Sequence, residues 1–170
     1  MGTTMRVSHV FDADVATVFA LMSDPGFLER KYDALGARDI RVESVDDRDG
    51  APRIVTRRTV TVDLPGFAKK VMQPTNALVQ TDDWAPEAAD GSRVCTYLVE
   101  LQGVPSRIQG TVTLRGEHGR TRQDVEARVT VSVPLLGGRL ERFAVGNAER
   151  QLQEEADVTT GELATGRDGG

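Results

Sequence analysis

The last third of the chain changes its hydrophobic period once, and this change constrains the fold more than any other feature. From residue 124 to residue 133, polar and apolar residues alternate strictly, which is the pattern of a β-strand with one buried face. Beyond Pro134, apolar residues recur every three or four positions, which predicts a long amphipathic α-helix. The residues of this helical stripe are Leu136, Leu140, Phe143, Ala144, Ala148, Leu152 and Ala156. A helix of this length over a one-sided sheet either completes a solid core or covers a cavity.

Length and composition indicate one globular domain. The chain has 170 residues, of which 39% are hydrophobic and 28% charged, and this is enough to bury a core. Its net charge is −5, with acidic and basic residues interleaved, so no nucleic acid partner is expected. Cys95 is the only cysteine and there are two histidines. An internal disulfide is therefore excluded, and no metal or cofactor is predicted.

The sequence shows no feature of a membrane or secreted protein. Residues 1–6 lack the apolar stretch of a signal peptide, and no segment reaches the ~20 apolar residues that cross a bilayer. We therefore expect a soluble cytoplasmic protein. Lys69 and Lys70 lie among apolar residues, but two lysines contribute only about 2 kcal/mol of attraction to an anionic membrane. No stable membrane anchoring is expected.

The order of elements predicts an α+β fold. Asp14 and Asp24 can cap two short helices, the second of which begins with Pro25. Strands joined by short turns are antiparallel neighbours, so we expect a curved antiparallel sheet of six or seven strands with the long C-terminal helix on its apolar face. The domain is expected to span residues 1–163 and to be followed by a disordered, glycine-rich tail at 164–170. The expected strands are residues 5–11, 38–45, 53–62, 78–85, 93–101, 107–116 and 121–133.

This arrangement resembles the START-like (helix-grip, SRPBCC) superfamily. Two features carry the resemblance: the early helix pair with Ser23-Asp24-Pro25 between its helices, and the ending VTVSVPLLGGRLE from Val129 to Glu141. The same ending, with Gln80-Thr81-Asp82-Asp83-Trp84 upstream, is similar to an uncharacterised bacterial family within this superfamily. The resemblance implies a cavity between the sheet and the long helix that holds apolar or amphipathic ligands.

The sequence supplies apolar side chains for the wall of such a cavity, together with small residues that leave volume unfilled. The alternative is that neighbouring large side chains fill this space and make the core solid. The candidate wall residues are Val60, Leu78, Leu98, Ile108, Gly110, Val112, Val129, Leu140, Phe143 and Ala144.

Four polar or amphipathic residues are candidates for contact with a ligand. His9 shares a strand face with apolar neighbours, and is either a hydrogen-bonded core residue or a base. The alternation around Arg58 predicts that it points inward, where it needs an acidic partner such as Glu100 or Asp82. It then forms either a structural ion pair or an anchor for a ligand carboxylate or phosphate. Trp84 and Tyr97 could line the pocket or cap the edge of the sheet.

The function predicted from these observations is binding of a hydrophobic or amphipathic small molecule, by a carrier or a sensor. A polyketide cyclase or aromatase is the first alternative, with His9 or Tyr97 as acid or base. A filled domain that acts through protein contacts is the second. No nucleophile elbow, phosphate-binding loop or metal-binding motif is present.

Overall fold

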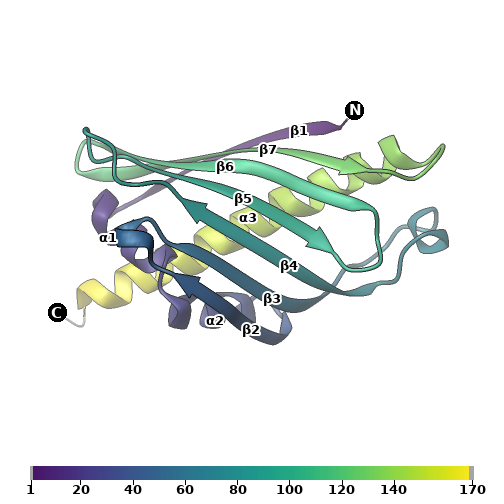
Figure 1. Ribbon diagram of the computed structural model, residues 1–170, viewed down its shortest axis with the longest axis horizontal. Coiled ribbons are helices and arrows are strands. Elements are labelled where there is room, and N and C mark those ends of the chain that lie inside the picture. The colour runs from purple at the N-terminus through teal and green to yellow at the C-terminus, as the bar shows by residue number, and fades with distance from the viewer. Residues whose placement is uncertain (1, 169–170) are drawn as a thin grey trace.

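The computed structural model describes residues 2–168, which form one curved antiparallel sheet and three α-helices (Figure 1). The strands follow the order β1-β7-β6-β5-β4-β3-β2, so every strand lies beside its neighbour in sequence except β1, which pairs with β7. The α+β class and the seven-stranded helix-grip architecture predicted from the sequence are confirmed. The strands are β1 Thr3–Phe11, β2 Arg38–Asp46, β3 Arg53–Thr61, β4 Thr75–Trp84, β5 Arg93–Leu101, β6 Ser106–Glu117 and β7 Arg120–Val131.

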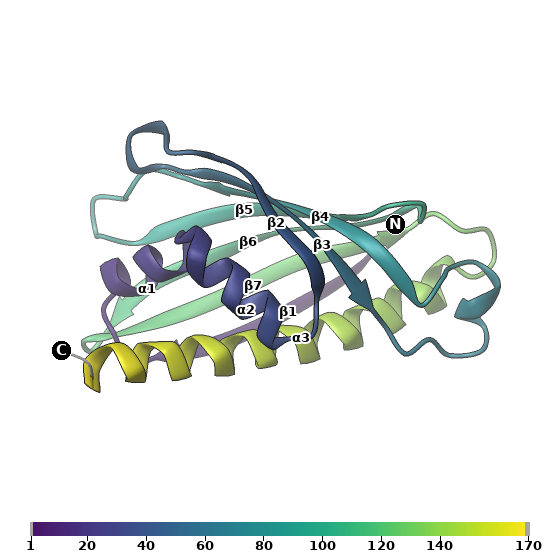
Figure 2. The same ribbon diagram turned by 90° about the horizontal axis from the view of Figure 1, so that it is seen from below.

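The three α-helices lie on the concave side of the sheet. Helix α3, Gly137–Asp168, runs along the whole length of this face, whereas the short helices α1 and α2 cover one end of it (Figure 2). Helix α1, Val15–Met22, is capped by Asp14, and α2, Pro25–Ala34, is capped by Asp24 with Pro25 in its first turn. Each cap accepts the backbone N–H of the residue three positions further on, which satisfies a group that the helix itself leaves unbonded.

The C-terminal residues differ from the sequence prediction. A disordered tail was predicted for residues 164–170, but residues 164–168 form the last part of helix α3, which continues to Asp168. Residues 169 and 170 lie outside the described residues. Leu163 explains the extension, because it is only 9% exposed and packs into the core with Phe11 and Val18. A buried leucine this close to the end stabilises a helix that glycine content alone argues against.

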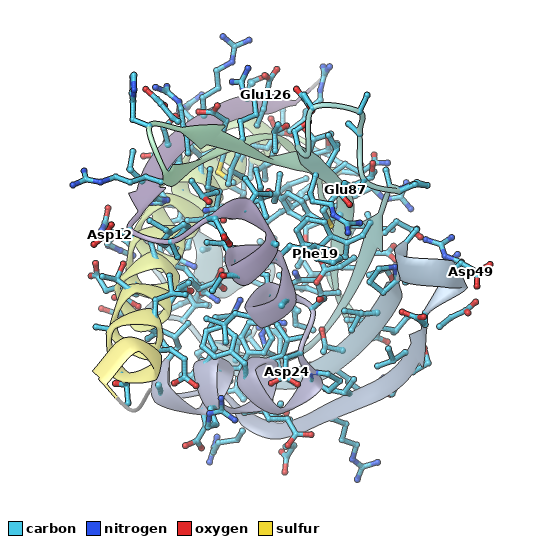
Figure 3. All side chains as sticks on the ribbon, turned by 90° about the vertical axis from the view of Figure 1, so that its left-hand side faces the viewer. Asp12, Phe19, Asp24, Asp49, Glu87 and Glu126 are labelled. Carbon is cyan, nitrogen blue, oxygen red and sulfur yellow. The ribbon has the colours of Figure 1, made fainter. Side chains whose placement is uncertain are left out.

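Two separate core clusters join α3 to the sheet. The first lies under α1, and Phe19 (labelled in Figure 3) packs against it. The ring of Phe19 packs edge-to-face on Trp84, with ring centroids 5.0 Å apart. The second surrounds Leu140 at the start of α3 and includes Leu64 and Ala68 from the irregular segment between β3 and β4. That segment contains a short 3₁₀ turn, Ala68–Lys70. The concave face between these two clusters remains available for a site.

The backbones of β6 and β7 approach each other closely at Gly110. This residue pairs with Ala127, and a Cβ atom at position 110 would lie 2.3 Å from the carbonyl oxygen of Glu126 and 2.7 Å from the Cβ of Ala127. The absence of a side chain at Gly110 is therefore a requirement of strand packing.

Gly110→Ala is expected to destabilise the protein by about 2 kcal/mol, because the added methyl group must displace backbone atoms. Gly161→Ala is the matched control, since a Cβ at position 161 meets nothing within 4 Å and alanine favours a helix by about 1 kcal/mol. Urea unfolding measures both, and a Gly110→Ala variant as stable as the parent contradicts this account of the close approach.

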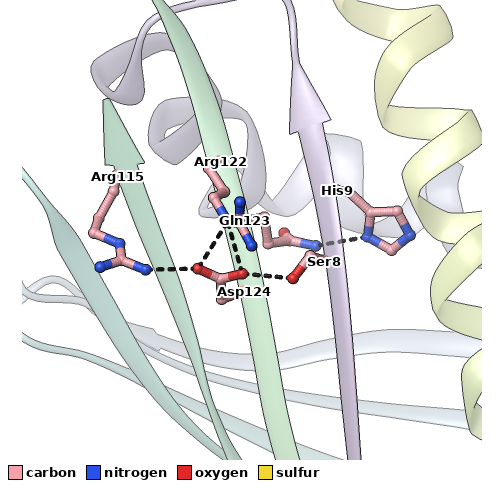
Figure 4. Close-up of polar contacts among 6 residues, drawn as sticks. All are labelled: Ser8, His9, Arg115, Arg122, Gln123 and Asp124. Atoms are coloured by element: carbon pink, nitrogen blue, oxygen red, sulfur yellow. Dashed lines mark hydrogen bonds and ion pairs between the residues drawn. The ribbon is translucent and has the colours of Figure 1, made fainter. Parts of the chain in front are cut away.

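A charged cluster on the outer face joins three strands. The carboxylate of Asp124 on β7 accepts hydrogen bonds from Ser8 at 2.6 Å, Arg115 at 2.8 Å and Arg122 at 3.1 Å (Figure 4). The hydroxyl of Ser8 and the two guanidinium groups stabilise the ionised form, and they lower the pKa of Asp124 to about 2.

This cluster predicts a pH dependence of stability. A carboxyl whose pKa is lowered on folding stabilises the protein above its unfolded pKa of about 4, and this contribution is lost as the pH falls towards 2. Asp124→Asn is therefore expected to cost about 1 kcal/mol at pH 7. Thermal unfolding of both proteins between pH 7 and pH 2 should show the difference shrinking below pH 4, and a constant difference contradicts the assignment.

Candidate functional site

A cavity of about 360 Å³ lies between the concave face of the sheet and α3. Its wall is predominantly apolar and comes from the middle of the strands and from one face of the helix. Exposed residues mark its mouth, among them Gly36 after α2, Thr61 at the end of β3, and Arg150 and Glu154 on α3. The cavity therefore opens to solvent between α2, β3 and the middle of α3.

Eight of the residues selected from the sequence lie on this wall. Their positions follow from alternation along each strand, which directs every second side chain inward, and from the apolar stripe of α3. The eight are Arg58, Val60, Leu78, Tyr97, Ile108, Leu140, Phe143 and Ala144.

A smaller chamber of about 90 Å³ lies deeper in the protein, towards α1. Trp84 and Val112 line this chamber and not the main cavity. Five residues belong to both walls and form the partition between the two spaces: Tyr32, Gln80, Tyr97, Leu152 and Glu155. Lys31 and Asp82 border the inner chamber alone.

Four predictions about individual residues are corrected by the structure. Leu98 follows Tyr97 directly in β5 and faces the opposite side of the sheet. Glu100 lies on that outer side too, where it pairs with Arg107 at 3.4 Å, so it is no partner of Arg58. Val129 is 1% exposed and packed within the core, and Gly110 is a site of strand contact; neither residue lines the main cavity or the inner chamber.

His9 lies outside both spaces, at the edge where β1 meets α3. Its Nε2 atom is 3.3 Å from Oε1 of Gln153 on the helix. Its Nδ1 atom is 3.5 Å from Nε2 of Gln123 (Figure 4). These contacts connect β1, β7 and α3, and they do not place the imidazole where a guest in the cavity could reach it.

Arg58 is the most unusual residue on the cavity wall. It is 3% exposed, and its guanidinium carbon lies 3.8 Å from the centre of the Tyr32 ring, in a cation–π contact. Its Nη2 atom donates to Oε1 of Gln80 at 3.2 Å, but Nε and Nη1 have no hydrogen-bond partner among the described residues. No carboxylate of residues 2–168 forms an ion pair with Arg58.

The neighbouring acidic groups are engaged elsewhere. Asp82, the second partner predicted for Arg58, accepts a hydrogen bond from Nε2 of Gln80 at 2.9 Å, so one amide joins it to Arg58. Burial raises the pKa of Asp82. Glu155 on α3 pairs with Lys31 on α2 at 3.9 Å, with 19% and 11% of their side chains exposed. The four charged groups and Gln80 thus form one buried polar network.

The sequence analysis missed Gln80, Lys31 and Glu155 as members of this site. Gln80 was detectable, because it alternates inward between Leu78 and Asp82 on β4. Lys31 and Glu155 come from two different helices, and their meeting depends on how α2 packs against α3. The only indication in the sequence that Glu155 is partly buried is its position next to Ala156, which belongs to the apolar stripe of the helix.

Further donors in the interior lack partners. The hydroxyl of Tyr97 and the indole N–H of Trp84 are buried and unbonded within the described residues. Burial raises the pKa of Tyr97 and of Cys95, so both stay protonated at neutral pH. Cys95 is 2% exposed, which agrees with its interpretation as a buried apolar residue.

A metal-binding cluster and a membrane-spanning helix are both absent from residues 2–168. No group of three or more histidine, cysteine or acidic side chains within residues 2–168 is placed to hold a metal ion. No helix in this part of the chain is long and apolar enough to span a membrane.

Comparison with known proteins agrees with this fold. A family model described as "Protein of unknown function (DUF2505)" matches residues 6–162. A curated relative from Mycobacterium tuberculosis, described as uncharacterised, is 26% identical over 127 residues, which cover 73% of this chain and 72% of that protein.

Two solved structures show the same architecture. The aromatase/cyclase Zhui from Streptomyces sp. R1128 has a TM-score of 0.68 at 13% identity and covers 95% of this chain and 93% of its own. A START superfamily protein from Mycobacterium smegmatis has a TM-score of 0.57 at 14% identity, with coverage of 95% and 97%. At such low sequence identity, structural similarity establishes the fold alone. This similarity confirms the START-like fold predicted from the sequence.

Two ion pairs join α2 to α3, and we expect the buried Lys31–Glu155 pair to contribute more to the free energy of unfolding than the exposed pair. Lys31→Met leaves Glu155 buried without a counter-ion and is expected to cost about 3 kcal/mol. Arg30→Met removes the exposed pair between Arg30 and Glu162 and should cost at most about 1 kcal/mol. Urea unfolding measures both changes, and equal losses contradict a buried role for Lys31. Lys31→Met combined with Glu155→Leu should recover most of the stability.

Proposed function

The chain belongs to the DUF2505 family, which is described as of unknown function, and we propose that it binds a small hydrophobic or amphipathic molecule in the main cavity, as a carrier or a sensor. One observation carries the proposal: about 360 Å³ between the sheet and α3 is left unfilled by the side chains that border it. Protein interiors are normally packed without voids of this size, and ligand sites are apolar hollows with a few polar groups.

The size of the cavity limits the guest. At roughly 30 Å³ per water molecule, the volume corresponds to about a dozen waters, which is near the lower end for small-molecule sites. A single aliphatic chain or one to two aromatic rings fits this space, whereas a two-chain phospholipid does not. Each 100 Å² of apolar guest surface removed from water contributes about 2.5 kcal/mol before the cost of association.

The mouth gives such a guest a route to the interior. Met72, from the segment between β3 and β4, and Gly36 border the opening on one side, and Arg150 borders it on the other. Polar and apolar groups meet there, as an amphipathic guest requires on entry.

An enzyme of the cyclase or aromatase type is the second candidate, because the structure brings more titratable groups to the interior than the sequence indicated. Glu155 and Tyr97 border the cavity, and Asp82 and Lys31 lie behind them. His9, which the sequence offered as a base, does not border the cavity. The mass of the guest separates the two functions, since cyclisation with dehydration releases a product lighter by one water, whereas a carrier returns its guest unchanged.

Filling the cavity tests the proposal directly. Ala144→Trp puts an indole into the cavity, and it is expected to weaken binding of the neutral fluorescent probe N-phenyl-1-naphthylamine by about tenfold or more. Glu149→Trp is the matched control, because residue 149 is exposed on α3 and does not border the cavity. Fluorescence titration measures both affinities, and a probe that binds all three proteins equally is not held in the cavity. Native mass spectrometry of the gently purified protein then identifies a retained guest by its mass.

A further inference from the structure

We propose that the guest is a small monoanion, an aliphatic or aromatic carboxylic acid, whose carboxylate binds the guanidinium group of Arg58. This inference rests on the proposed function, and it names the chemical class that the same cavity selects. It follows from the position, the contacts and the missing counter-ion of Arg58.

The guanidinium group is held ready for an anion. Its face is fixed on Tyr32, whose hydroxyl lies 3.5 Å from Oε1 of Gln80, and Gln80 accepts the bond from Nη2 of Arg58. Within residues 2–168, one N–H on Nε and two on Nη1 remain without an acceptor. Because the Arg58 side chain is already immobilised, it loses little conformational entropy when a carboxylate binds.

The charges around Arg58 leave a place for one negative charge. Glu155 is paired with Lys31, and Asp82 is bonded to Gln80. Asp82 is joined to Arg58 only through the amide of Gln80, so no carboxylate of residues 2–168 contacts the guanidinium group directly. A buried guanidinium without a counter-ion is costly, and a bound monoanion removes that cost. A phosphate monoester carries nearly two charges at neutral pH, and the other cation of this wall, Arg150, is exposed at the mouth of the cavity, where water weakens its attraction for a second charge.

The strand register places an apolar surface next to this anchor. Arg58 pairs with Leu78, which pairs in turn with Leu101. Val60 lies two residues further along β3 on the same face, and all three apolar residues border the cavity. A carboxylate on Arg58 thus directs the tail of the molecule over these side chains and under Phe143 of α3.

Matched ligands test the charge requirement in the unmodified protein. Decanoate and 1-decanol have the same chain, and we expect decanoate to bind about 10- to 100-fold more tightly, which is the gain of charge-assisted hydrogen bonds to a buried group. Decyl phosphate should bind more weakly than decanoate. Displacement of N-phenyl-1-naphthylamine measures all three affinities. Equal binding of decanol and decanoate, or tighter binding of decyl phosphate, overturns the proposal.

Two neighbouring arginines supply matched variants. Arg58→Met should remove the preference for decanoate and change the affinity for decanol less than about twofold. Arg57→Met makes the same change in net charge on the opposite face of β3 and should leave both affinities unchanged. A preference that survives in Arg58→Met, or that falls equally in Arg57→Met, assigns the effect to the general field of the protein and overturns the proposal.

The outcomes also separate this inference from the broader one. If the neutral probe, decanol and decanoate all fail to bind, the cavity holds no apolar guest and the proposed function fails. If decanol and the probe bind but decanoate has no advantage, the proposed function stands and the anionic class is wrong. If Arg58→Met folds poorly, Arg58→Lys tests the same point. Lysine keeps the positive charge but lacks the planar guanidinium group, so this variant should retain only part of the preference for decanoate over decanol.

Discussion

Helix α3 packs on the β1–β7 side of the sheet, and the cavity exists because the middle of the helix does not close on β3, β4 and β5. At the start of the helix, the carboxylate of Glu141 accepts the backbone N–H of Val131 at 2.9 Å and the hydroxyl of Thr3 at 3.1 Å. Glu141 is 7% exposed, so these bonds tie the helix to both strands of the β1–β7 pair without competition from water. Towards the other end, Ala156 and Leu163 enter the core under α1. The stretch between these anchors spans the curved face without filling it.

The same arrangement explains why the interior can hold charged groups. A sheet that closed tightly on α3 would need apolar side chains at the inward positions 58, 80 and 82, which are instead arginine, glutamine and aspartate. Replacing a buried polar network by apolar residues is often neutral or stabilising. The presence of Arg58 with N–H groups unbonded within residues 2–168 is therefore not explained by stability, and it agrees with the proposed role of Arg58 in binding a carboxylate.

Much of the fold could be predicted from the sequence because each of its parts depends on a local pattern. Alternation located the strands, and Asp14 and Asp24 located the starts of the two short helices. The site was predicted less completely. Alternation gives two faces but not which is inward, and this led to the choice of Leu98 beside Tyr97 and of Glu100 beside Asp82. Contacts between distant elements left no local signal, as with Lys31 on α2 and Glu155 on α3, or His9 and Gln153 at the edge of the sheet.

The partition between the two chambers bears on the direction in which a guest lies. Tyr32, Gln80 and Tyr97, with Leu152 and Glu155 of α3, separate the main cavity from an inner space bordered by Lys31 and Asp82. This inner space of about 90 Å³ holds only about three water molecules, so it is too small for the apolar tail of a guest. The apolar surface that remains, on β3, β4 and β5, faces α3. A guest whose polar end reaches Arg58 at this partition must therefore extend its apolar part along the sheet beneath the helix. Proteins of the same fold whose interiors carry other polar groups at this depth would select other guests, because the fold supplies the space and the inward side chains supply the selection.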